Sequence, residues 1–218
     1  MEREKLIPKH GGYRKLKSFQ LAQLIYDITV RFCEHYIDGR SRTRDQMVQA
    51  ARSGVQNIAE GSQASGTSRK TELKLTGVAR ASLEELQLDY EDFLRQRELP
   101  QWEPNHPVLK RFKARRCSTM DEFRAWVEDE RKRAKDTDKH GLTQTNTDAK
   151  TRTLSVGVGE RPCRSVPVSV FVANGTLSLL NLCCHLLDRQ LSAQADTVEQ
   201  EVGFTERLYQ VRMKKRAR

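Results

Sequence analysis

The sequence of 218 residues lacks the marks of a membrane, secreted or disulfide-rich protein. No apolar run approaches the roughly 18 residues that a membrane-spanning helix needs, and the N-terminus has no apolar segment of a signal peptide. The five cysteines show no paired spacing, and their odd number indicates reduced thiols rather than a disulfide framework. We therefore expect a cytoplasmic protein with no membrane contact.

Signatures of catalysis and of bound cofactors are also lacking. No Ser-His-Asp or Cys-His spacing stands out, and no Gly-rich phosphate loop follows a strand. Cys183, Cys184 and His185 are consecutive, so on a helix they point about 100° apart and do not readily converge on one metal ion. We expect a protein that is not an enzyme, has no cofactor and holds no metal.

One acidic set leaves a metal-dependent alternative open. Glu85, Asp89 and Asp92 share a helical face and, together with Glu60, would offer carboxylates to a divalent cation, as a nuclease requires. The simpler interpretation is a solvated face, or one that pairs with arginines of a neighbouring subunit. We favour the simpler interpretation.

What the chain does have is positive charge. Lysine and arginine number 39 against 29 acidic residues, a net charge of +10, while hydrophobic residues make up only 37%. Basic clusters lie at 109–116, at 131–135 and at the C-terminus. Such clusters suit a phosphate backbone, and a solvated surface is the alternative for each of them.

Apolar residues recur at helical spacing in four segments. In the first segment, Leu21, Ile25, Ile28 and Phe32 form one stripe. In the second, Thr43 and Gln46 have the spacing of a capping box. The pattern predicts an all-α protein, an antiparallel four-helix bundle, with helices at 13–37, 43–61, 67–97 and 172–192.

The region between the third and fourth helices has a different composition. It holds five of the six prolines and a polar run at 137–153. Only 120–135 looks helical there, and 152–159 is either a short strand or an irregular loop. We interpret the region as a long, partly disordered insertion, in which 137–152 is mobile and dispensable. The predicted division is an N-terminal arm (1–12), three bundle helices (13–97), the insertion (98–170), and the fourth helix with a basic C-terminal suffix (171–218).

The second helix contains residues that are poor helix formers. Glycine in a helix interior is less favourable than alanine by roughly 1 kcal/mol. Small residues allow a neighbouring backbone to come close, and a buried asparagine needs hydrogen-bond partners, here on a neighbouring helix or loop. We predict a tight helix-packing motif with a polar pin, made of Ser53, Gly54, Asn57, Glu60 and Gly61.

Basic residues gather at the starts of two helices. The macrodipole disfavours positive charge there, but free backbone amides attract anions and arginines would reinforce an anion site. The alternative is that the second-helix arginines form salt bridges with Asp38, Asp45 or the third helix. The predicted nucleic-acid-binding residues are Arg40, Arg42 and Arg44 at the second helix, and Arg69, Lys70 and Lys74 at the third.

The sequence also resembles a known family. The run A-A-R-S-G-V-Q-N-I-A-E-G at 50–61 and A-R-A-S-L-E-E-L at 79–86 resemble the four-helix-bundle proteins encoded within bacterial ribosomal-RNA intervening sequences. The segment at 16–27 fits the first helix of that family. The segments at 186–191 and 203–209 resemble a subgroup with an additional C-terminal suffix. The chain is similar, too, to the accessory variability determinant of diversity-generating retroelements.

The resemblance implies an antiparallel bundle that assembles into a pentameric ring. It also implies a basic, non-enzymatic protein that binds RNA and a reverse transcriptase. The region 98–170 departs from the family. Independently, the first helix is apolar on more than one side, which predicts a homo-oligomer.

Two functional hypotheses follow. The first is a non-enzymatic accessory protein that binds RNA or single-stranded DNA and has a reverse transcriptase as a possible partner. The second is an oligomeric scaffold that binds another protein without nucleic acid.

Overall fold

The computed structural model describes residues 10–143 and 166–200, together with positions 208, 209, 212 and 213. Within these residues all regular secondary structure is helical, which confirms the all-α prediction. The elements are a 3₁₀ turn η1 (Tyr13–Lys15), α1 (Lys17–Tyr36), α2 (Arg42–Ala64), α3 (Arg69–Gln96), α4 (Pro107–Arg115), α5 (Met120–Thr143) and α6 (Val168–Gln200).

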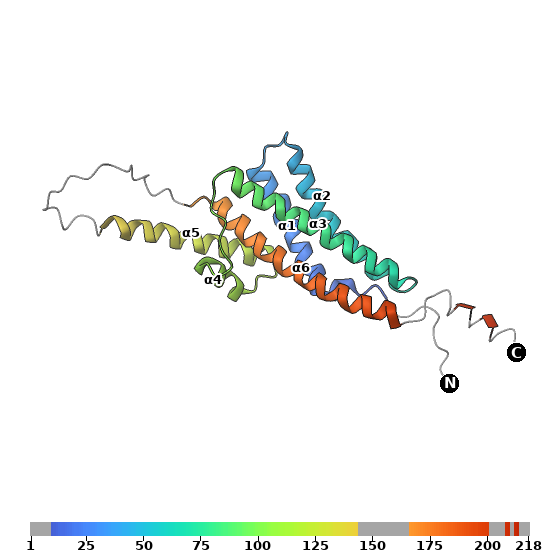
Figure 1. Cartoon of the computed structure of the whole chain (residues 1–218). Coiled ribbons are helices and arrows are strands. Elements are labelled where there is room, and N and C mark those ends of the chain that lie inside the picture. Colours follow the sequence, from blue (N-terminus) through green and yellow to red (C-terminus); the bar gives the residue numbers. More distant parts are fainter. Residues whose placement is uncertain (1–9, 144–165, 201–207, 210–211, 214–218) are drawn as a thin grey trace.

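Helices α1, α2, α3 and α6 make the most extensive contacts with one another around the core (Figure 1). Helix α2 contacts α1 and α3, and α6 contacts the same two helices. The predicted stripe of α1 is buried, with Ile25, Ile28 and Phe32 each at most 2% exposed. Burial of such side chains stabilises the fold by roughly 1.5–3 kcal/mol each. The fully buried Tyr90 donates its hydroxyl to Thr29 Oγ1 at 3.1 Å, which ties α3 to α1 without an orphaned polar atom.

Several helix boundaries differ from the prediction. The first segment is broken at Leu16, whose extended backbone separates η1 from α1. Helix α2 starts one residue before the predicted start, because Ser41, not Thr43, is the N-cap and accepts from the Thr43 amide at 3.3 Å. The capping box of Thr43 and Gln46 is therefore wrong. Helix α2 also continues through Gly61 to Ala64, and α6 extends beyond 172–192 at both ends.

The region predicted as an insertion contains two helices, not one. Helix α4 was missed, and α5 continues eight residues past the predicted end at 135. Phe112, Phe123 and Trp126 are at most 3% exposed and belong to the same apolar core as the buried residues of α1, α2, α3 and α6. The ring of Trp126 lies over Gly175 of α6, where a Cβ would meet Cζ3 at 2.7 Å. Residues 98–143 therefore complete the core rather than standing apart from it.

Parts of some predictions lie outside the described residues. The segment expected to be mobile, 137–152, begins inside α5, and its part from 144 onward is not described. The possible strand at 152–159 and most of the suffix also lie outside the described residues.

The apolar surplus expected on α1 is used within the chain. Phe19 and Leu24 lie outside the main stripe yet are at most 9% exposed, and α1 also contacts η1 and α5. Helix α1 therefore has no surplus apolar surface of the kind from which the homo-oligomer was predicted.

Helix α6 is more apolar than the sequence analysis allowed. It contains an 18-residue window with a mean hydropathy of 1.6, enough by length and composition to cross a membrane. The prediction that no apolar segment approaches the length of a membrane-spanning helix is therefore wrong for α6. Sixty-one per cent of the window is buried inside the protein, as is usual for a core helix.

The small residues of α2 pack against α3. A Cβ on Gly54 would lie 2.6 Å from Cδ2 of the fully buried Leu83, and one on Gly61 would lie 3.3 Å from a carbonyl oxygen of α3. Ser53 Oγ and Ser82 Oγ are 2.9 Å apart. Asn57 donates to the carbonyl and hydroxyl of Ser53 on its own helix. Among the described residues, the side chain of Asn57 is therefore linked to α3 by hydrogen bonds only through Ser53, whose hydroxyl bonds to that of Ser82.

This packing predicts opposite effects for two glycine substitutions. Gly54→Ala should destabilise the protein by about 1 kcal/mol, because displacing Leu83 outweighs the gain in helix propensity. Gly77→Ala is the matched control, because nothing lies within 4 Å of its Cβ position on α3. It should stabilise by roughly 0.8–1 kcal/mol. Urea unfolding measures both, and equal effects would contradict the close-contact assignment.

Candidate nucleic-acid interface

The α2 start carries three arginines, as predicted. Arg40 and Arg42 are exposed and Arg44 is half-buried. Within the described part of the chain, none of the three side chains forms an ion pair with a carboxylate, although Asp38 accepts the backbone amide of Arg40 at 2.8 Å. The salt-bridge alternative is therefore not realised here, and these guanidinium groups are available to an external anion.

The three basic residues at the α3 start differ in whether they form an ion pair. Arg69 pairs with Glu72 at 3.0 Å on its own helix. Lys70 and Lys74 are exposed and form no ion pair among the described residues. Ser68 caps the helix by accepting the Thr71 amide at 3.2 Å. The two lysines are therefore stronger candidates for phosphate contact than Arg69.

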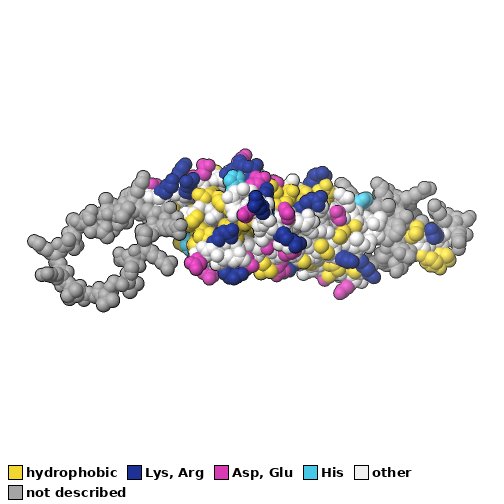
Figure 2. Space-filling view, turned by 90° about the horizontal axis from the view of Figure 1, so that it is seen from above, with side chains coloured by type: hydrophobic (Ala, Val, Ile, Leu, Met, Phe, Trp, Pro, Cys, Tyr) yellow, Lys and Arg dark blue, Asp and Glu magenta, His cyan; other side chains and the backbone are white. Residues whose placement is uncertain are grey.

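The six residues do not form one patch. The two groups lie at opposite ends of α2, whose 23 residues span about 35 Å (Figure 1). Figure 2 shows Lys and Arg side chains interspersed with Asp and Glu over the face seen from above. A single phosphate therefore cannot contact both groups in one chain.

The basic clusters outside these helix starts have mixed roles. Arg111 donates to Glu130 at 2.7 Å and Arg115 to Asp129 at 2.7 Å, so the 109–116 cluster partly joins α4 to α5. Arg131 on α5 is exposed and lies near Tyr36 at the end of α1, where its charge opposes the burial that raises the Tyr36 pKa. Sequence reasoning could not place this arginine near the α1–α2 turn, because only the folded chain brings α5 there.

The acidic set on α3 does not form a metal centre. Asp92 pairs with Arg95 at 2.7 Å and Glu60 is exposed. Among the residues whose side chains the structure describes, no three His, Cys, Asp or Glu are grouped as metal ligands. Burial, reinforced by Glu85 and Asp92, raises the pKa of Asp89 to about 6.

The consecutive cysteines are packing residues. Cys183 is fully buried and donates its thiol to the Ser18 carbonyl at 3.4 Å. Burial raises the pKa of Cys183 to about 12, so it stays protonated and is a poor metal ligand or nucleophile.

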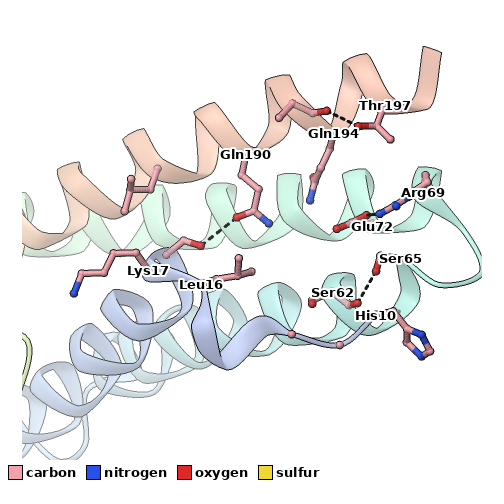
Figure 3. A pocket seen from close by; sticks show the side chains of 15 residues that line it. His10, Leu16, Lys17, Ser62, Ser65, Arg69, Glu72, Gln190, Gln194 and Thr197 are labelled. Atoms are coloured by element: carbon pink, nitrogen blue, oxygen red, sulfur yellow. Dashed lines mark hydrogen bonds and ion pairs between the residues drawn. The ribbon is translucent and has the colours of Figure 1, made fainter. Parts of the chain in front are cut away.

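A cavity of about 560 Å³ lies beside the α3 start (Figure 3). It is lined by the segment before α1, the first residues of α1, the end of α2, the start of α3 and the last part of α6. Its polar lining includes Ser62, Ser65, Gln190, Gln194 and the Arg69–Glu72 pair. A larger cavity of about 1160 Å³ lies between α4 and α6, and its apolar lining includes Trp102, Leu109 and Leu182.

Comparison of the chain with protein-family models, curated proteins and solved structures finds no match.

The raised pKa of Asp89 predicts a pH-dependent stability difference. A carboxyl that titrates near 6 when folded and near 3.8 when unfolded destabilises the fold when ionised, so its effect is complete above pH 6 and disappears as the pH falls toward 4. Asp89→Asn should therefore stabilise by about 1 kcal/mol at pH 7.5, a value reduced for solvent screening.

Thermal unfolding at pH 7.5, 6, 5 and 4 measures the difference between Asp89→Asn and the native chain. Asp27→Asn, at an exposed position of α1, removes the same charge without the burial and is the control. A difference that stays constant with pH would contradict the assignment.

Proposed function

We propose that the protein is a non-enzymatic accessory protein that binds RNA or single-stranded DNA through phosphates. The observation that supports this most is the absence of ion pairs at Arg40, Arg42 and Arg44 among the described residues. They stand at a helix start without a carboxylate partner among the described residues, although Asp38 and Asp45 are neighbours in sequence. Arginines without a carboxylate partner at the positive end of a helix dipole favour a phosphate.

The arrangement of the helices is the second part of the proposal. We take α1, α2, α3 and α6 as an antiparallel four-helix bundle with α4 and α5 inserted before the last helix. Ser18, near the start of α1, donates to Gln190 in the last third of α6, and Tyr90 of α3 donates to Thr29 of α1. The resemblance at 50–61 and 79–86 to intervening-sequence proteins supports this arrangement and a reverse transcriptase as the protein partner.

A salt titration tests nucleic-acid binding. The native chain should bind single-stranded RNA with an affinity that falls steeply with salt. Replacing Arg40, Arg42 and Arg44 by glutamine should weaken binding and reduce the salt slope by about one for each lost phosphate contact. Fluorescence anisotropy from 50 to 300 mM salt, with a labelled oligonucleotide, measures both quantities.

The control removes the same charge elsewhere. Arg52, Arg124 and Arg189 are exposed on α2, α5 and α6, away from the α2 start. Their triple replacement by glutamine should change the slope much less. Equal losses in both triple variants would attribute binding to net charge alone, and no binding by the native chain at low salt would favour the scaffold.

We also propose a homo-oligomer, with a ring of five by resemblance. Since α1 is buried within the chain, the contact is assigned to the outer face of α3, where Val78 is 41% and Leu88 is 59% exposed. Light scattering of the native chain should give five times the 25.1 kDa of one chain.

The double variant Val78→Gln, Leu88→Gln should dissociate the oligomer. Leu182→Gln is the control, because that side chain is 46% exposed but lies on α6 in the larger cavity. A native chain that stays monomeric at micromolar concentration would reject the oligomer.

A further inference from the structure

The cavity beside the α3 start has the size and lining of a ligand site. Its volume of about 560 Å³ lies within the usual range for small-molecule pockets. Three stretches distant in sequence line it, at 10–18, 62–72 and 186–197, and one hydrogen bond fixes its N-terminal wall: the Gly11 amide donates to the Ser62 carbonyl at 3.0 Å. Gly11 has a φ of +79°, a conformation that glycine adopts without strain.

One polar group in this cavity has no partner among the described residues. The Oε1 atom of Gln194 is buried and accepts no hydrogen bond there. Figure 3 shows Gln194 extending from α6 toward α3 and Glu72. A buried acceptor without a donor is unfavourable by about 1–3 kcal/mol, so the fold retains a destabilising group that a bound donor would satisfy.

The neighbouring groups are already engaged. Gln190 accepts from Ser18 Oγ at 3.1 Å, Ser65 donates to the Ser62 carbonyl at 2.8 Å, and Glu72 is held by Arg69. These bonds fix the walls, and Gln194 Oε1 is the buried acceptor in this lining that has no donor among the described residues. Leu16 and Leu186 add apolar lining, which suits the face of a flat ring.

We propose that this cavity receives one base of the bound single strand and that Gln194 recognises it. The inference rests on the proposed function, because the strand must first be held by phosphate contacts. Lys70 and Lys74 extend from the same α3 start, and Lys17 lines the cavity itself. A strand held by these cations passes the cavity entrance.

The chemistry of the amide favours adenine. A glutamine side chain offers an acceptor beside a donor, and adenine presents the complementary N6 donor beside the N7 or N1 acceptor. Such a pair discriminates between bases by roughly fivefold or more. The native chain should therefore bind oligoadenylate at least about fivefold more tightly than oligouridylate of equal length.

The test compares Gln194→Leu with the native chain. This variant removes the amide, and should equalise the two affinities without changing the salt slope, because phosphate contacts remain. The free variant should also unfold at a higher urea concentration, because an unsatisfied buried acceptor is gone. A merely structural role for Gln194 predicts a loss of stability instead. Gln49→Leu, at an exposed position of α2, is the control and should preserve the adenylate preference.

A titration with adenosine separates this inference from the proposed function. Adenosine carries no phosphate, so chemical-shift changes at the Gln194 side-chain amide report the cavity alone. Salt-dependent binding of both oligonucleotides with equal affinity, and no response to adenosine, would overturn the base site while the proposed function stands. A saturable response to adenosine without any binding of oligonucleotides would support a nucleoside site and overturn the proposed function.

Discussion

The close approach of α2 to α3 is the constraint on which the rest of the structure depends. Gly54 lets Leu83 lie against the backbone of α2, and Gly61 brings the start of α3 within contact of the end of α2. Larger side chains at these positions would separate the helices, since interhelical distance follows the residues at the contact. That separation would expose Leu83 and remove the wall that Glu72 contributes to the smaller cavity.

The second constraint acts on α6. One apolar face of α6 is covered by α4 and α5, and without them it would be exposed to water. Trp126 of α5 packs over Gly175 on this face. The region between α3 and α6 is therefore part of the folding unit. It also lines the larger cavity and brings Arg131 near the α1–α2 turn.

Arginine serves two purposes in this protein, and position decides which. Arg111 and Arg115 lie opposite Glu130 and Asp129 on the next helix and join two elements. The guanidinium groups of Arg40, Arg42 and Arg44 form no ion pair with a carboxylate among the described residues. Arg69 occupies an equivalent place on α3 but pairs with Glu72 three residues later. The sequence suggested a shared role for Arg69 and the α2 arginines, and side-chain geometry separates them.

The sequence by itself determined the all-α class and the place of every described helix except α4. Ile25, Ile28 and Phe32 recur at the helical period, and periodicity is a local property that survives in any helical fold. Periodicity did not predict α4, because the nine residues of this helix include only two buried side chains, Leu109 and Phe112. Only the tertiary structure decided the ion pairs, the location of Arg131 and the cavity around Gln194. Each of these joins residues distant in the chain, and no local pattern records which distant groups will meet.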